Sequence, residues 1–227
     1  MNRLGTTYGG WIIPDNMNDI RVVYCGGVGE DISFDIKLQS KYDCNIILID
    51  PTLKSKKHYE ECIRYFKDKS FKFTGGIQPD YYMSIENENP NFDKFTYVDK
   101  GLWNEKATLK FYSQDVDEYV SKSLIDGMFS DKYEMVDVDT IKNIMTSLGH
   151  DHIDLLKIDI EGAEIKVVNA MLDDGIHPRY VCIEFDLFLK DKDPDQLTEK
   201  LINRLCAHGY TIIANDTMNI TFKLSPI

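Results

Sequence analysis

The sequence lacks several patterns that would each fix a functional class. None of its five cysteines is spaced as Cys-x-x-Cys, so we expect no zinc knuckle. No serine stands in a Gly-x-Ser-x-Gly elbow and no histidines form His-Glu-x-x-His, which leaves hydrolase chemistry without support. The apolar runs are of strand length, far shorter than a membrane span. No charged stretch followed by an apolar one opens the chain, so we expect no secretion signal and a cytoplasmic location with reduced thiols.

Positive charge is also scarce. The 227 residues include 26 Lys and Arg against 38 Asp and Glu, which gives a net charge of −12. Nucleic acids and anionic membranes are bound by clustered basic side chains, so neither is expected as the main partner. Hydrophobic residues make up 43% and charged residues 28%, which is typical of a globular protein. We therefore expect a single domain over residues 1–227 with an ample core.

Short apolar runs alternate with helical stretches along the chain. The pattern predicts strands at 21–25, 45–50, 71–74, 95–102, 108–112, 153–159 and 180–185. It predicts helices at 32–41, 54–67, 140–148, 163–172 and 194–208. Residues 211–214 and 219–223 are expected to form a closing hairpin. This alternation is typical of an α/β fold with a doubly wound, mainly parallel sheet and an antiparallel hairpin at its edge.

Two polar, acidic stretches interrupt this alternation. Long loops in compact domains are often lids or binding loops, although many are only solvated surface. Residues 80–93 are expected to be a surface loop. Residues 113–137 are a candidate lid insertion.

The most informative segment is residues 153–164, an apolar run that contains Lys157 and ends in acidic residues and a glycine. A buried lysine is costly unless it is paired, and Asp159 lies two residues on, on the same side of an extended strand. Ligands of open α/β sheets bind at the carboxyl ends of the strands, where Asp159 would lie. A Lys–Asp pair that only stabilises the strand edge fits the spacing equally well.

A glycine-rich turn follows the first expected strand, over residues 25–31. Glycine lets a backbone turn tightly and approach a ligand closely. The second strand ends in Asp50, about twenty residues on, where an acid can bind the two hydroxyls of a ribose. The full Gly-x-Gly-x-x-Gly pattern and a Walker A lysine are both absent. A cofactor without a pyrophosphate, such as S-adenosylmethionine, therefore fits better than a dinucleotide.

Three further carboxylates follow two later strands: Asp159 ends one, and Glu184 and Asp186 end the next. Adjacent parallel strands would bring them into one crevice, where clustered oxygen ligands suit Mg²⁺ or another divalent cation. Such an ion would lower the pKa of a substrate hydroxyl. Alternatively, one carboxylate acts as a general base with its pKa raised by its neighbours. These acids could also do no more than solvate the strand ends.

Taken together, these segments resemble FkbM-type methyltransferases, which are S-adenosylmethionine-dependent O-methyltransferases of the seven-stranded class I (Rossmann-like) fold. The resemblance extends over nearly the whole chain. Its most specific part is residues 155–164, Leu-Leu-Lys-Ile-Asp-Ile-Glu-Gly-Ala-Glu. Supporting segments lie at 8–11, 27–35, 50–52, 101–103 and 120–123.

The resemblance implies roles for individual residues. The cofactor would be bound by Gly27, Gly29, Glu30, Asp50, Pro51, Thr52, Gly101 and Leu102, with the ribose on Asp50 and the adenine near Gly101 and Leu102. Asp159 would be the main catalytic residue, together with Lys157 and Glu184. A metal would be held by Asp159, Glu184 and Asp186. Residues 1–20 would pack near the site.

The chain departs from the family pattern at Cys25, where many class I methyltransferases carry an acid at the end of the first strand. Either Glu30 or Asp31 supplies that charge, or backbone carbonyls hold the cofactor's amino group. The resemblance implies a sugar or glycan hydroxyl as the acceptor, and a non-sugar small molecule is the alternative. A cofactor-binding module without catalysis also remains open. A nucleotide-dependent oxidoreductase is disfavoured by the incomplete glycine pattern.

Overall fold

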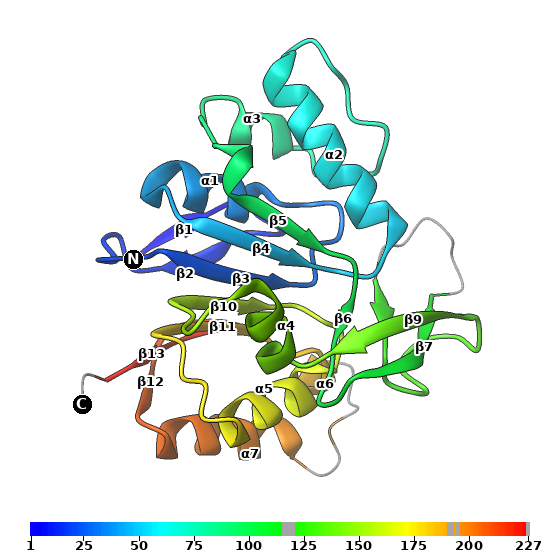
Figure 1. Cartoon of the computed structure of the whole chain (residues 1–227), viewed down its shortest axis with the longest axis vertical. Coiled ribbons are helices and arrows are strands. Elements are labelled where there is room, and N and C mark those ends of the chain that lie inside the picture. Colours follow the sequence, from blue (N-terminus) through cyan, green and yellow to red (C-terminus); the bar gives the residue numbers. More distant parts are fainter. Residues whose placement is uncertain (115–120, 190–192, 194–195, 226–227) are drawn as a thin grey trace.

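The structure is a computed structural model that describes all residues except 115–120, 190–192, 194–195 and 226–227. Its centre is a seven-stranded sheet in the order β12-β13-β11-β10-β3-β4-β5 (Figure 1). The neighbouring strands β11, β10, β3, β4 and β5 run parallel. They span Tyr180–Glu184, Leu155–Ile158, Val22–Gly26, Asn45–Ile49 and Phe95–Val98. An antiparallel hairpin of β12 (Tyr210–Asp216) and β13 (Asn219–Leu224) closes one edge.

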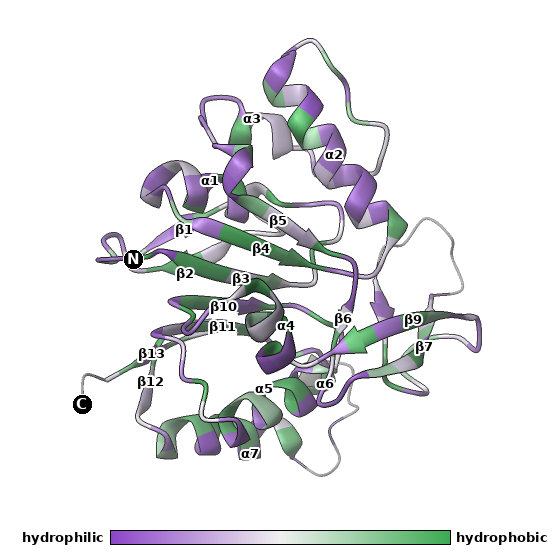
Figure 2. Cartoon of the chain, viewed as in Figure 1, coloured by the Kyte–Doolittle hydropathy of each residue, from purple (hydrophilic) through white to green (hydrophobic). Residues whose placement is uncertain are grey.

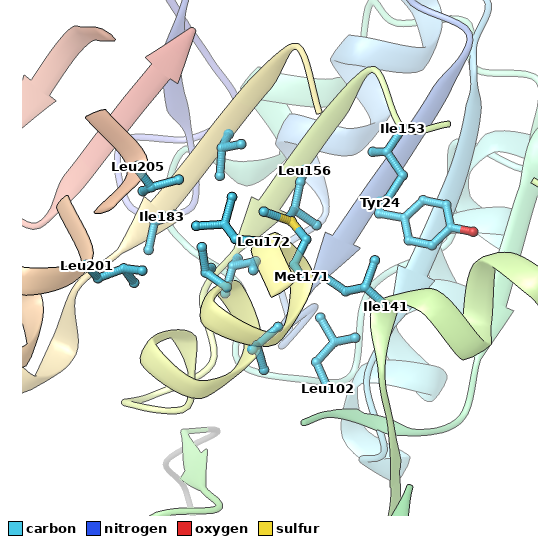
Figure 3. Packing of buried hydrophobic residues seen from close by; sticks show 14 of the residues in the cluster. Tyr24, Leu102, Ile141, Ile153, Leu156, Met171, Leu172, Ile183, Leu201 and Leu205 are labelled. Atoms are coloured by element: carbon cyan, nitrogen blue, oxygen red, sulfur yellow. The ribbon is translucent and has the colours of Figure 1, made fainter. Parts of the chain in front are cut away.

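Helices cover both faces of this sheet. One face packs against α1 (Ser33–Tyr42), α2 (Leu53–Lys67) and α3 (Tyr81–Ile85). The other packs against α4 (Ile141–Leu148), α5 (Glu164–Asp173) and α7 (Leu197–Ala207), and Figure 3 shows part of that core. Strands buried on both faces are mainly apolar, as β3, β4, β10 and β11 are in Figure 2, with Lys157 in β10 as an exception. The predicted α/β architecture with a mainly parallel sheet is confirmed.

A second, four-stranded sheet stands beyond the carboxyl ends of β4 and β5 (Figure 1). It consists of β6 (Gly101–Leu102), β9 (Tyr133–Asp139), β7 (Ala107–Ser113) and β8 (Lys122–Ser123). The predicted strand 95–102 is therefore two strands in different sheets. The candidate lid 113–137 contributes β8 and most of β9, and part of it lies outside the described residues. In β9, buried Val136 and Val138 alternate with exposed Met135 and Asp137, as in a half-buried strand.

Two predictions about local structure were wrong. Residues 71–74 form no strand, because Phe71 and Phe73 instead pack into an aromatic cluster with neighbours from α2 and α3. Residues 80–93 are more than a surface loop, since α3 buries Tyr81 and Ile85 completely in the core. The predicted helix 194–208 corresponds to α7, and residues 194–195 at its start lie outside the described residues.

The N-terminal residues form a small hairpin of β1 (Asn2–Leu4) and β2 (Trp11–Ile13). The Thr221 hydroxyl donates to the Ile12 carbonyl and thereby ties this hairpin to β13 at 2.7 Å. The connection between β1 and β2 consequently reaches the carboxyl-end side of the large sheet. Among the described residues, no helix combines the length and the apolar character needed to cross a membrane.

Candidate active site

A cavity of about 570 Å³ opens at the carboxyl ends of β3, β4, β10 and β11. All but one of the residues proposed from the sequence line it. They are Gly27, Gly29, Glu30, Asp50, Pro51, Thr52, Gly101, Leu102, Lys157, Asp159 and Glu184. Asp186, at the start of α6 (Asp186–Leu189), is buried and does not line the cavity. The fold thus brings side chains from four strand ends to one place, as parallel strands require.

Two of the three glycines in the glycine-rich turn, Gly27 and Gly29, have a positive φ but differ in the space around them. Gly27 has a φ of +76°, and a Cβ there would lie 1.6 Å from the carbonyl oxygen of Asp159. Any side chain at this position would therefore push β3 and β10 apart. Gly29 has a φ of +57°, but a Cβ would meet no atom within 4 Å. Its bare backbone leaves open space at the cavity wall.

Asp50 holds the glycine-rich turn from the end of β4. One carboxylate oxygen accepts from the backbone N–H groups of Val28 and Gly29, at 2.9 and 3.2 Å. The other accepts from the N–H and the hydroxyl of Thr52, at 2.8 and 2.7 Å. A carboxylate has about four acceptor positions, so these bonds fill them. A ribose hydroxyl bound here would share or replace one of these donors, and the ribose role of Asp50 stays a prediction.

The two acids that follow Gly29 differ in their hydrogen bonding. One oxygen of Asp31 accepts from the Thr6 hydroxyl at 2.5 Å, and the other from the Ser33 N–H, at the start of α1, at 2.9 Å. The Glu30 carboxylate lines the cavity and makes no hydrogen bond or ion pair with any described residue. Glu30 is therefore the acid at this turn that is available to a ligand.

Lys157 lines the cavity, with a side chain that is only 6% exposed. Its ammonium donates to the Gly27 carbonyl and lies 3.9 Å from the carboxylate of Asp159. Burial opposes the charged form, but the attraction of Asp159 and Asp35 outweighs it and raises the pKa of Lys157. The lysine stays charged and links the glycine-rich turn to the end of β10. Its geometry is that of a positioning residue.

Asp159 and Glu184 form a crowded pair at the ends of β10 and β11. The two carboxyl groups are close enough to share a hydrogen bond. Burial raises the pKa of Asp159 despite the attraction of Lys157. Burial and the neighbouring carboxylates raise the pKa of Glu184 to about 9. Near neutral pH this pair retains a proton, and its charged oxygens can accept one from a ligand hydroxyl.

The predicted metal site at Asp159, Glu184 and Asp186 is not found. Across the described ranges, no group of three or more His, Cys, Asp or Glu side chains is arranged to hold a metal ion. Asp186 is buried and is not part of the cavity lining, and the Asp159 carboxylate lies 3.9 Å from the Lys157 ammonium. These residues as placed do not fit a divalent cation, and we derive no chemical step from one.

Tyr8 lines the acid end of the cavity, although it is 70% exposed. Burial by the cavity wall, together with Asp159, Glu184 and other carboxylates, raises the pKa of its phenol. Met218 and Asn219, at the β12–β13 turn, line the same end. Sequence reasoning did not place these two because a hairpin turn carries no signal for what lies opposite it.

A family model described as the methyltransferase FkbM domain matches residues 23–212, from β3 into β12. No curated protein and no solved structure gave a match. The matched range contains the glycine-rich turn, the Asp50 strand end and the Asp159–Glu184 pair. It covers most of the 227 residues. The chain therefore belongs to the methyltransferase FkbM domain family.

Proposed function

We propose that this methyltransferase transfers the methyl group of S-adenosylmethionine to a hydroxyl of a sugar or glycan. The observation that carries the proposal is the shared cavity. It joins the glycine-rich turn to the Asp159–Glu184 carboxyl pair. A methyl donor and a hydroxyl acceptor need these two sets of groups side by side, because positioning alone lowers the barrier substantially.

The cofactor proposal rests on what the cavity offers each part of S-adenosylmethionine. The N–H groups of Val28 and Gly29, which could otherwise hold a pyrophosphate, already donate to Asp50. S-adenosylmethionine has no phosphate but carries an ammonium group, for which the unengaged Glu30 carboxylate is a partner. Leu102 is 3% exposed and gives an apolar wall for the adenine. When bound, the cofactor supplies an electrophilic methyl group on a sulfonium.

The class I methyltransferase fold is supported by the sheet. Five adjacent strands are parallel, and the strand order reverses at β3, because β4 and β5 follow on one side of it and β10 and β11 on the other. The glycine-rich turn lies at this switch point, where doubly wound folds bind nucleotides. The antiparallel hairpin β12–β13 beside β11 agrees with the seven-stranded class I arrangement.

The acceptor chemistry is assigned to the carboxyl pair. An alcohol has a pKa far above 7, so its attack on a methyl group is helped by a base. Asp159 would accept the hydroxyl proton, with Glu184 holding the pair's shared proton. Lys157 would keep Asp159 in place through its contacts to the strand end and to Gly27.

Cys25 stands where an acid is common, which favours the alternative of a cofactor-binding module without catalysis. Glu30 weakens that alternative because it places a carboxylate on the same cavity wall. A non-sugar hydroxyl acceptor is the second alternative. We also propose a cytoplasmic location, since all five cysteines are free thiols, as expected in a reducing compartment.

The test is methyl transfer from tritiated S-adenosylmethionine to a panel of free sugars, methyl glycosides and small alcohols, with the product isolated and the methylated oxygen identified. Incorporation into a saccharide hydroxyl would support the proposal. Cofactor binding without transfer to any member would favour the non-catalytic module, and transfer only to non-sugar alcohols would favour the second alternative.

A further inference from the structure

We infer that Ser123 is a positioning residue of the methyl-transfer reaction, and that its buried hydroxyl fixes the turn after β10 and thereby holds Asp159 in place. The turn comprises residues 159–162, whereas Ser123 belongs to β8 of the second sheet. Ser123 is not part of the cavity lining, so it acts through the turn and not on the acceptor itself. This inference rests on the proposed function and adds a residue to the same site.

The turn after β10 contains a backbone conformation that needs support from its surroundings. Glu161 has a φ of +53° and Gly162 a φ of +99°. Glycine adopts such values readily, whereas a residue with a side chain rarely does and stays there only when neighbouring groups hold it. Asp159 begins this turn. Its position therefore depends on the contacts that keep Glu161 in the left-handed region.

Ser123 makes a polar contact with this residue. The Ser123 hydroxyl donates to the carbonyl oxygen of Glu161 at 2.6 Å and accepts from the N–H of Ile125 at 3.0 Å. The Ser123 side chain is completely buried, so solvent does not compete for either bond. A buried polar group that loses its partner is costly. The bond therefore favours the conformation in which the Glu161 carbonyl faces β8.

The chain that follows Ser123 also packs against the turn with apolar side chains. A Cβ at Gly162 would lie 3.3 Å from Ile125 and 3.4 Å from Met128. It would lie 3.2 Å from Leu187 of α6. Side chains this close leave the turn little room to move. The polar and the apolar contacts thus come from one stretch of chain, residues 123–128, and act on the same turn.

These contacts connect Asp159 with both sheets. Ser123 pairs with Tyr112 of β7, so its hydroxyl is carried by a hydrogen-bonded strand of the second sheet. The Asp159 N–H donates to the Gly26 carbonyl of β3, in the large sheet, at 3.0 Å. A displacement of about 1 Å near a reacting group can lower a rate by about 10²-fold. A turn that is held on both sides is therefore important for turnover.

Ser130 makes the same pair of bonds at a distance from the turn, and it gives a matched control. Its hydroxyl donates to the Ser113 carbonyl at 2.7 Å and accepts from the N–H of Lys132 at 3.3 Å. Ser130 lies in the same insertion, residues 113–137, and is not part of the active-site cavity lining. Ser123→Ala and Ser130→Ala thus delete equivalent bonds, but only Ser123→Ala deletes the bond to the Asp159 turn.

The first test measures turnover with tritiated S-adenosylmethionine and the acceptor identified with the wild type. We expect Ser123→Ala to lower kcat by about tenfold or more, because Asp159 is less well placed, and to change KM for S-adenosylmethionine by no more than about twofold. Ser130→Ala should leave both constants unchanged. Unchanged kcat in Ser123→Ala, or equal losses in the two variants, would overturn the inference. Failure of Ser123→Ala to fold would also overturn it, since the hydroxyl would then be structural.

A second test needs no acceptor and so separates this inference from the proposed function. Mass spectrometry follows backbone hydrogen exchange in a peptide that contains residues 159–163. Ser123→Ala should raise the exchange rate by about tenfold or more, because the turn opens more often, whereas Ser130→Ala should not change it. An unchanged rate in Ser123→Ala would contradict the inference even where methyl transfer is found. Faster exchange without transfer to any acceptor would overturn the proposed function, and the catalytic role of Ser123 with it.

Discussion

The two ends of the cavity use carboxylates in opposite ways. At the glycine-rich turn, Asp50 and Asp31 accept hydrogen bonds from backbone N–H groups and hydroxyls. At the ends of β10 and β11, Asp159 and Glu184 crowd each other, and burial raises the pKa of both. The first pair stabilises a binding surface, whereas the second retains reactivity. The same residue type therefore serves structure or chemistry according to the donors around it.

The largest expected effect separates these two ends directly. Asp159→Asn should lower methyl transfer by about 10²-fold or more, because the amide cannot accept the hydroxyl proton. Binding of S-adenosylhomocysteine, measured by calorimetry, should change by no more than about threefold, since Glu30 and the glycine-rich turn are untouched. Asp137→Asn, an exposed change on β9, serves as the control. If Asp159→Asn instead unfolds the protein, the Lys157–Asp159 pair is structural.

Glu164, in the first turn of α5, is a further buried carboxyl group with a raised pKa. It is completely buried, and burial raises its pKa to about 8. A carboxyl whose pKa is raised on folding makes the folded state bind protons more tightly. The free energy of unfolding should therefore fall as pH rises from about 5 to about 8, which is the range between the unfolded and folded pKa values.

Glu164→Gln should remove this pH dependence. We expect the variant to exceed the wild type in unfolding free energy by on the order of 2–4 kcal/mol at pH 9 and by little at pH 5. Urea denaturation at pH 5, 7 and 9 measures the free energy of unfolding of both proteins. Glu199→Gln, at an exposed position, is the control. An unchanged pH slope in Glu164→Gln would show that this carboxyl does not titrate as described.

Asp50→Asn tests the structural end of the comparison. The amide retains one acceptor oxygen, so two of the four donors at Asp50 lose their partner. Unfolding free energy should fall by about 1–3 kcal/mol, measured by urea denaturation. Asp99→Asn changes an exposed acid one strand away and should have a much smaller effect. Equal losses in the two variants would argue against Asp50 as the anchor of the glycine-rich turn.

Glu30→Gln should give the smallest effect, confined to binding. Loss of the charge should weaken the binding of S-adenosylhomocysteine by about tenfold. Thermal stability should stay unchanged, because Glu30 has no partner among the described residues. Asp31→Asn is the informative comparison, since it breaks the bonds to Thr6 and Ser33 and should lower thermal stability. The reverse pattern would assign the cofactor's amino group to Asp31.

Much of the fold follows from the sequence because the buried strands are unambiguous. The strands at Val22–Gly26, Asn45–Ile49 and Tyr180–Glu184 read as continuous apolar runs, which only a sheet covered on both faces accommodates. The segment 71–74 resembles a strand in sequence, but Phe71 and Phe73 pack in an aromatic cluster and the segment joins no sheet. Strand β9 was missed because acidic residues interrupt its alternation.

For the candidate site, too, the sequence indicates some features and not others. Strand ends next to glycines and acids in the sequence indicate where the cavity wall lies, and Asp50, Asp159 and Glu184 all line that cavity. The sequence could not indicate which oxygens are already occupied. That Asp50 already accepts hydrogen bonds from Val28, Gly29 and Thr52, and that Asp186 is not part of the cavity lining, depend on side-chain geometry created only when β4, β10 and β11 meet.

The most direct test of the central claim is a calorimetric titration of the full chain with S-adenosylhomocysteine, set beside an identical titration with NAD. We predict one-to-one binding of S-adenosylhomocysteine in the micromolar range, about −8 kcal/mol, and no binding of NAD, whose pyrophosphate would meet the carboxylates that fill the turn. Binding of NAD, or binding of neither compound, would contradict the assignment of this cavity to a methyl-donor cofactor.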